Sequence, residues 1–402
     1  MRALSLVTVL LLAGCWSRDD FRSQCILAGN CQLDDVDAGF DGGLELKRWE
    51  EVAAFLFDGL DGGDSSFDVS FVSNRTGPFR TRDDECGFVA GVLTTAGSVI
   101  CAPVDVLPAL EVLPDGGANV LSVTRGDGGQ WGGGVLLENG RVFAAPTSGA
   151  EWLAITEPVP GSARGFDLVP LVAGSAPLTG LVRTLEGVLV APGRGNAVVF
   201  RVDGGATALT GEDAGVDFAG ALLMPSGKVV FVPRSASQLV EVTLRGSTGL
   251  DRVTPRGRFT GLAGGLLLES GEALLTPAVS GGVFVRVPAD GGVPTSLPTL
   301  SRTSLFSATW STNGYAYGLD VDGGSAQVAV IDRRGAVTWQ QLPSSALDAG
   351  LFGPLSHVGL TAMPDGRLVS CGCRSSSAMI LTPRAGRTLP LEVMTSPWLN
   401  KW

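Results

Sequence analysis

Seven segments of the chain share one arrangement: an apolar stretch, a tight turn that closes on glycine, and a second apolar stretch. Successive turn glycines are 43, 47, 40, 44, 43 and 52 residues apart. A period of this length predicts stacked units, each of which buries its apolar face against its neighbours. The turn glycines are Gly97, Gly140, Gly187, Gly227, Gly271, Gly314 and Gly366.

The composition favours strands within these repeats. The 402 residues include 57 Gly and 23 Pro, yet 45% of the chain is hydrophobic, which argues against disorder. Third apolar stretches follow in most copies, for example Val283–Val287 and Gln327–Ile331, and Asp290-Gly291 is the chemistry of a tight hairpin turn. Each repeat therefore reads as a four-stranded antiparallel meander, and its length is that of a propeller blade.

The repeat resembles those of kelch and galactose-oxidase-like propellers, and a bacterial repeat of the form G-x-x-L-x-x-D-G-K-V-x-x-x-P-x-x-x-x-x-V. The resemblance covers about residues 86–395. It implies an all-β, seven-bladed β-propeller and is almost silent about function. The repeats are expected at about 86–128, 129–175, 176–215, 216–258, 259–302, 303–352 and 353–395.

Residues 46–85 precede the first clear repeat but belong to the predicted propeller domain, residues 46–402. Val52–Phe57 and Phe67–Val72 are strand candidates within them. These residues are expected to supply the outer strand that closes the ring, or alternatively a degenerate eighth blade.

Two positions recur in all seven copies. The residue seven places before the turn glycine is always small, which predicts crowding where the innermost strands converge near the axis. These residues are Ala90, Gly133, Gly180, Gly220, Gly264, Ser307 and Gly359. The residue nine places before it is bulky in every copy: Phe88, Trp131, Leu178, Phe218, Leu262, Leu305 and His357.

The first fourteen residues have the features of a secretory signal peptide: Arg2, an apolar run, and small residues at a cleavage point. Leu12-Ala13-Gly14-Cys15 resembles the bacterial lipobox, in which the cysteine is acylated and becomes the mature N-terminus. Trp16 rather than Asp follows, which by resemblance to enterobacterial sorting favours the outer membrane. Residues 15–45 are acidic and read as a flexible tether between the lipid and the propeller.

The charge and the histidine count exclude several partners and cofactors. With 29 basic and 40 acidic residues the net charge is −11, which disfavours nucleic acid and anionic lipid headgroups as partners. A metal site is not expected, because the chain has one histidine and no C-x-x-C pair. No cofactor is predicted, and the protein is expected to be a monomer.

Six further cysteines in an exported chain are interpreted as disulfide partners. Cys25 and Cys31 are expected to pair within the tether. The other four lie in the first and last repeats, which are neighbours in a closed ring, so at least one bond between these repeats is expected. Local bonds, Cys86 to Cys101 and Cys371 to Cys373, are the alternative.

Catalysis is not the favoured interpretation. His357 occupies the bulky slot of its repeat, which favours packing, and one histidine with Tyr315 and Tyr317 cannot supply the two histidines and two tyrosines of galactose-oxidase copper chemistry. The favoured function is ligand or protein binding by a membrane-anchored lipoprotein whose ligand is an unknown protein or carbohydrate. The alternative is a cell-surface carbohydrate-active hydrolase or lyase that uses channel carboxylates. The candidate rim binding residues are Arg194, Asn196, Arg234, Ser235 and Arg374.

Overall fold

The computed structural model describes most of the chain from residue 43 onward. The predicted signal peptide, Cys15, Cys25 and Cys31 lie outside the described residues. The described ranges are 43–60, 64–73, 88–103, 109–121, 130–137, 139–148, 151–156, 164–170, 178, 180–185, 187–192, 196–200, 206–210, 218–235, 238–244, 250–301, 305–320, 327–343, 357–372 and 377–399.

The strands that the structure describes form seven four-stranded antiparallel sheets, which we number by the order of their inner strands. Sheet 1 comprises β2 (Phe88–Leu93), β3 (Val99–Pro103), β4 (Ala109–Val112) and β5 (Ala118–Leu121). Sheet 2 comprises β6 (Gln130–Leu136), β7 (Val142–Ser148), β8 (Glu151–Ile155) and β9 (Phe166–Pro170). Sheet 3 comprises β10 (Val182–Arg183), β11 (Leu189–Pro192), β12 (Asn196–Phe200) and β13 (Ala206–Thr210).

The remaining sheets follow the same plan. Sheet 4 comprises β14 (Phe218–Leu223), β15 (Val229–Pro233), β16 (Leu239–Leu244) and β17 (Leu250–Gly257). Sheet 5 comprises β18 (Leu262–Leu267), β19 (Ala273–Pro277), β20 (Val283–Val287) and β21 (Thr295–Leu300). Sheet 6 comprises β22 (Leu305–Trp310), β23 (Ala316–Asp320), β24 (Gln327–Ile331) and β25 (Val337–Gln341). Sheet 7 comprises β26 (His357–Ala362), β27 (Leu368–Gly372), β28 (Ser377–Pro383) and β1 (Phe67–Ser73).

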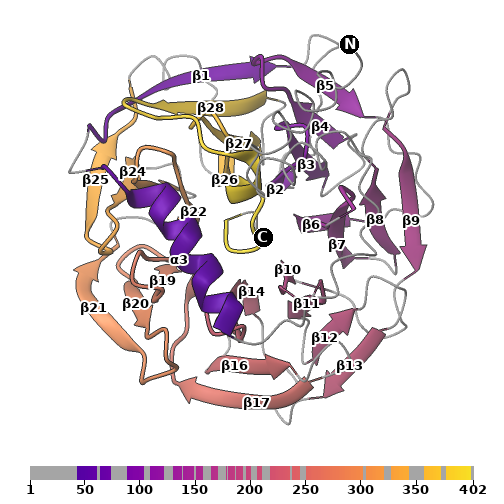
Figure 1. Cartoon of the computed structure of the whole chain (residues 1–402), viewed down its shortest axis with the longest axis vertical. Coiled ribbons are helices and arrows are strands. Elements are labelled where there is room, and N and C mark those ends of the chain that lie inside the picture. Colours follow the sequence, from indigo (N-terminus) through magenta and orange to yellow (C-terminus); the bar gives the residue numbers. More distant parts are fainter. Residues whose placement is uncertain are drawn as a thin grey trace, which may run out of the picture. The chain divides into compact units, whose positions relative to one another are not determined.

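These sheets stand around a central axis as the blades of a β-propeller, with the first strand of each nearest the axis (Figure 1). The N-terminal strand β1 pairs with β28 over its whole length, from Phe67 opposite Pro383 to Ser73 opposite Ser377. Residues 67–73 therefore supply the outer strand of the last sheet, which is the first of the two alternatives that the sequence left open.

The turn glycines have the conformation that the repeat requires. All seven have a positive φ, between 74° and 90°, in the left-handed region that other residues rarely adopt. In each turn the glycine N–H donates to the carbonyl three residues earlier, as from Gly227 to Met224 at 3.0 Å. The Asp290-Gly291 turn between the third and fourth strands of sheet 5 is confirmed in the same way, with Gly291 at φ 81°.

The small residues of the inner strands lie at irregularities in strand pairing. In sheet 2 the register jumps between Trp131 and Gly134, and the intervening Gly133 has φ 27°. The crowding expected near the axis is present at Gly180, where an added Cβ would lie 2.9 Å from the Cα of Gly220 on the next inner strand. A neighbouring position that the sequence did not single out is equally tight, since a Cβ at Gly134 would lie 2.5 Å from a backbone carbonyl oxygen.

A disulfide joins the first and last sheets. Cys101 of β3 bonds to Cys371 of β27, and both residues are buried. The expected bond between these repeats is thus confirmed; Cys86 and Cys373 lie outside the described residues. Beside the bond, Thr361 of sheet 7 donates its hydroxyl to the carbonyl of Gly91 in sheet 1 at 2.8 Å. The ring is closed both by β1 and by this covalent link.

The prediction of a strand at Val52–Phe57 is wrong, because these residues belong to helix α3 (Gly43–Phe57). The short apolar run was interpreted alone, whereas the wider window has helical spacing. Its buried side chains recur at three- and four-residue intervals: Trp49, Val52, Ala53, Leu56 and Phe57. The helix begins before residue 46, the predicted start of the propeller domain.

Candidate functional site

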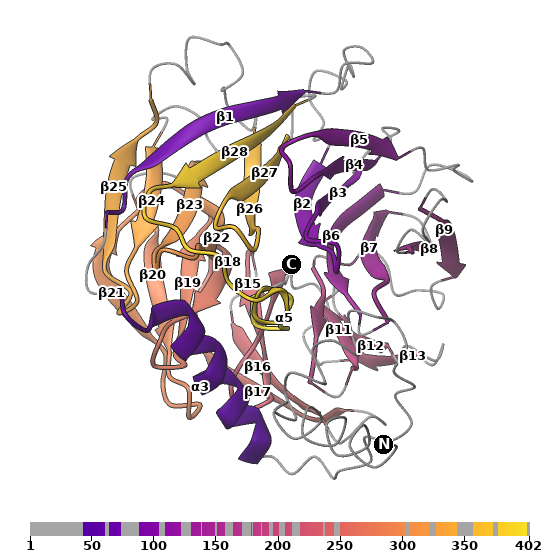
Figure 2. The same ribbon diagram turned by 45° about the horizontal axis from the view of Figure 1, so that its top comes forward.

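The two faces of the ring carry different kinds of chain segment. The turns that join first to second strands lie on one face, and α3 and the short helix α5 (Leu391–Met394) cross that face in Figure 2. Trp49 of α3 packs edge-on against Trp398, with ring centroids 6.1 Å apart, and Phe57 packs against Trp310 at 4.8 Å. We call this side the capped face. The antiparallel order of each sheet places the loops after its second and fourth strands on the opposite side, which we call the loop face.

Arg387 fastens this cap to the ring. Its guanidinium donates to the carbonyls of Phe55 and Asp58 at the end of α3, and its backbone N–H donates to the Thr312 hydroxyl at 3.1 Å. Thr312 belongs to the first turn of sheet 6. The C-terminal segment therefore holds α3 against the sheets that α3 covers. Among the helices that the structure describes, none is both long and apolar enough to span a membrane.

A small cavity lies at the axis, against the inner strands of sheets 4 to 7. Its volume is about 30 Å³, which leaves room for only a few water molecules. The described residues around it are glycine, alanine, valine, leucine and one threonine, and none is ionisable. Leu399 closes it from the C-terminal segment. The described lining of this cavity offers no carboxylate for catalysis.

The loop face is described in most detail between sheets 4 and 5. Arg234 follows β15, and its carbonyl accepts hydrogen bonds from Gly261 N–H at 2.7 Å and from the Thr260 hydroxyl at 3.2 Å. Gly261 in turn accepts from Ala278 N–H at 2.7 Å. Backbone hydrogen bonds thus fix three loops side by side: the loops after β15, β17 and β19.

The surface of these loops is cationic and partly apolar. Arg234, Ser235, Arg258 and Thr260 are exposed, and 53% of Val279 is accessible to solvent. We call these five residues the loop-face patch. Segments 233–235, 258–261 and 277–282 contain no aspartate or glutamate, although acidic residues outnumber basic ones in the chain. These three described segments therefore carry a local positive charge.

The structure describes the side chains of only two of the five predicted rim residues. Arg234 and Ser235 lie on the loop face, as expected from their place after a second strand. Asn196 begins β12 opposite Thr210, and its side chain lies outside the described part of the chain, as do Arg194 and Arg374. Arg258 and Val279 were missed. Arg258 follows a fourth strand, and the sequence argument had considered only the loops after second strands.

His357 begins β26, where it pairs with Gly372. Its side chain is outside the described residues, so its packing role stays a prediction.

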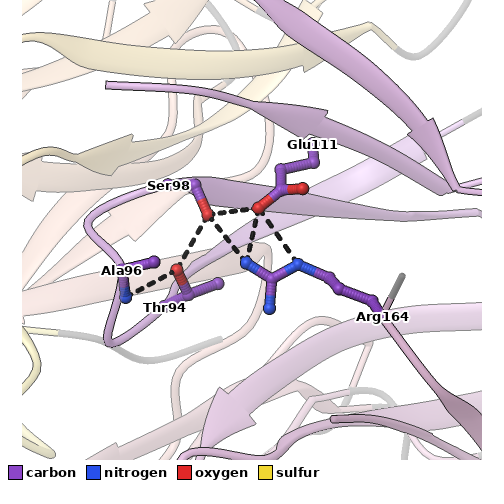
Figure 3. A network of polar contacts seen from close by, with 5 residues as sticks. All are labelled: Thr94, Ala96, Ser98, Glu111 and Arg164. Carbon is purple, nitrogen blue, oxygen red and sulfur yellow. Dashed lines mark hydrogen bonds and ion pairs between the residues drawn. The ribbon is translucent and has the colours of Figure 1, made fainter. Parts of the chain in front are cut away.

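A buried charged group lies between sheets 1 and 2, far from the loop face. Glu111 of β4 accepts hydrogen bonds from the Arg164 guanidinium at 2.5 and 3.1 Å and from the Ser98 hydroxyl at 2.6 Å (Figure 3). Ser98 also contacts Thr94, with 2.8 Å between their hydroxyl oxygens. The Glu111 and Arg164 side chains are 6% and 5% exposed. The pair joins one sheet to the turn region of the next.

This carboxylate is poorly suited to acid–base catalysis. Burial acts to raise the pKa of Glu111, but the hydrogen bonds from Arg164 and Ser98 and the charge of Arg164 outweigh burial and hold it below its ordinary value. Such a group stays ionised and accepts protons weakly at neutral pH. Because the pair is also closed to solvent, its role is to join two sheets.

Glu241 occupies the equivalent place in sheet 4, fourteen residues after the turn glycine as in sheet 1. It pairs with Lys228 at 3.0 Å and with Arg256 at 2.7 Å. Burial acts to raise its pKa as well, but the hydrogen bonds and charges of Arg256 and Lys228 lower it overall. No group of three or more metal-ligating side chains occurs among the described residues.

No family model matches the chain, and no curated protein matches it. Solved structures do. A streptogramin B lyase is 14% identical with a TM-score of 0.63, over 79% of this chain and 98% of that one. A virginiamycin B lyase from Staphylococcus aureus is 12% identical with a TM-score of 0.61, over 79% and 99% of the two chains. An inactive variant of the S. aureus enzyme, solved with quinupristin, is 11% identical with a TM-score of 0.60, over the same shares.

The likeness is one of fold. TM-scores of 0.60 to 0.63 support the β-propeller fold. At sequence identities of 11% to 14%, no residue role is transferred to this chain.

Proposed function

We propose that this protein is an exported lipoprotein, anchored through acylated Cys15, whose propeller binds a protein or carbohydrate ligand without catalysing a reaction. The sequence Leu12-Ala13-Gly14-Cys15 after an apolar run supports the anchor. Trp16 favours the outer membrane as its location, and the kelch-like assignment of the repeat rests on the sequence pattern alone. We take the protein to act as a monomer without a cofactor.

The observation that carries the binding role is the contrast between the axis and the loop face. The axial cavity has a volume of about 30 Å³ and no ionisable lining among the described residues. The loop-face patch instead presents exposed arginine, hydroxyl and valine side chains on loops fixed by hydrogen bonds. Rigidly held polar and apolar groups on a surface favour recognition, because little conformational entropy is lost when a partner binds.

Fractionation of the bacterium tests the anchor. Wild-type protein should sediment with membranes, and Cys15→Ser should release it into the soluble envelope fraction, because the acyl chains supply the membrane affinity. Cys25→Ser is the matched control and should stay with the membrane. Membrane association of Cys15→Ser at the wild-type level would refute the proposal.

A lyase is the second candidate, favoured by the structural likeness to streptogramin and virginiamycin B lyases. A lyase role predicts that purified protein removes quinupristin over time in a chromatographic assay. We expect no loss of quinupristin, because the described lining of the axial cavity has no side chain that can act as a general base. Turnover above that of heat-denatured protein would overturn the non-catalytic assignment.

A further inference from the structure

We propose that the loop-face patch binds an acidic segment of a partner protein, with Arg234 and Arg258 as the charged contacts and Val279 as the apolar contact. This inference rests on the proposed binding function and names its ligand chemistry. The three residues come from separate loops that meet between sheets 4 and 5.

The arginine side chains of the two faces differ in their ion pairs. Ion pairs among the described residues gather at turns of the capped face, as in Arg367–Asp365 at 2.6 Å and Arg333–Glu269 at 3.6 Å. Arg234 and Arg258 have no such carboxylate partner among the residues the structure describes. Two exposed guanidiniums without a carboxylate partner among the described residues, on a chain of net charge −11, favour a local site for anions.

The loops that carry the patch are fixed to one another. The carbonyl of Arg234 receives two hydrogen bonds from residues 260 and 261, so the backbone that carries Arg234 is fixed to the loop that carries Arg258. A Cβ at Gly261 would lie 3.9 Å from a methyl carbon of Val279, which places this exposed valine against the same loop. The ring of Phe259 lies inward, 3.0 Å from the Cβ position of Gly257, and helps to support the loop.

The side chains of the patch suit an acidic peptide better than a sugar. Arginine binds carboxylates through two parallel hydrogen bonds, and arginine is enriched in protein–protein interfaces. Sugar rings are commonly held by stacking on exposed aromatic rings, whereas the patch has valine as its apolar surface and Phe259 is only partly exposed. An acidic peptide with an apolar side chain between its carboxylates satisfies both kinds of group.

The probe is a fluorescein-labelled peptide of alternating aspartate and valine, titrated against the soluble protein lacking residues 1–15 and followed by anisotropy. Its counterpart has asparagine in place of aspartate, and hexagalacturonate tests the carbohydrate alternative. Binding of the aspartate peptide should weaken at least tenfold in R234A/R258A. The asparagine peptide should bind the wild-type protein no more tightly than the aspartate peptide binds R234A/R258A.

Arg334→Ala is the matched control. Arg334 is an exposed arginine in a turn of the capped face, so R334A removes one positive charge without touching the patch. It should bind the peptide within twofold of wild type, and all variants should melt at the wild-type temperature. Equal weakening by R334A, no binding to wild type, or binding of hexagalacturonate alone would overturn the proposal. These three outcomes concern only the ligand of the loop-face patch. The lipid anchor is tested separately by fractionation, and the absence of catalysis by the quinupristin assay.

Discussion

The disulfide between Cys101 and Cys371 gives the most direct energetic prediction. It links residues 270 positions apart and therefore closes most of the chain into one loop. The perturbation is best made in a background with Cys86→Ala and Cys373→Ala, so that no second link between these repeats can form. In that background, reduction of the bond is compared with the further substitutions Cys101→Ala and Cys371→Ala.

The magnitude follows from the loop length. In the chain-entropy model a loop of this size restricts the unfolded chain by about 5.6 kcal/mol at 25 °C, and measured values are commonly about 2–4 kcal/mol. Both cysteines are buried, and a Cβ added at Gly91 would lie 3.2 Å from the Cys371 sulfur, so the folded state has little freedom to relax when the bond is cut. We expect the free energy of unfolding to fall by about 2–5 kcal/mol.

The assay is equilibrium unfolding in urea, followed by tryptophan fluorescence, with and without reductant. Reduction should lower the midpoint of the background protein and leave the variant without Cys101 and Cys371 unchanged, which controls for other effects of the reductant. Peptide mapping without reduction should recover the Cys101–Cys371 pair. Unfolding free energies that agree within about 0.5 kcal/mol before and after reduction would refute the claim that this bond stabilises the ring.

Three further substitutions test the packing and the buried charges. Gly134→Ala should destabilise by about 1–3 kcal/mol in urea, because the added methyl overlaps a backbone oxygen. Gly42→Ala, in the tether predicted from the sequence, is its control and should change little. Glu111→Gln leaves Arg164 buried without its charge partner and should cost about 3–5 kcal/mol at pH 7. Because the pKa of Glu111 is lowered in the fold, its stabilisation is present at neutral pH and lost as the pH falls through that pKa, so the two proteins should converge in acid. Burial raises the pKa of Tyr317 to about 12, so stability should fall as the pH rises above about 10, and Tyr317→Phe should lose less between pH 9 and pH 11.

The turns and strands of each repeat could be predicted from the sequence. The turn glycines must adopt positive φ, and the alternating apolar stretches must bury one face, so strands such as Val283–Val287 were predicted with their observed bounds. An outer strand supplied by residues 46–85 was one of the two alternatives that the repeat pattern left open, and a disulfide between the first and last repeats followed from their being neighbours in a closed ring. Both are consequences of periodicity.

Contacts that the repeat pattern does not imply could not be predicted from the sequence. Glu111 and Arg164 are 53 positions apart and meet only because adjacent sheets pack side by side. Helix α3 was missed because a six-residue apolar window does not distinguish a helix from a strand, and its burial depends on the face that it covers. Arg258 was missed because the repeat alignment did not extend to the loops after fourth strands, which are where the loop-face patch gains its second arginine.

The central claim is lipid anchorage at Cys15, and mass spectrometry of the mature N-terminus in the native bacterium tests it most directly. The account predicts that the first peptide begins at Cys15 and carries the added mass of acyl chains, and that this species disappears in Cys15→Ser. A mature protein that begins at another residue, or one that begins at an unmodified Cys15, would contradict it.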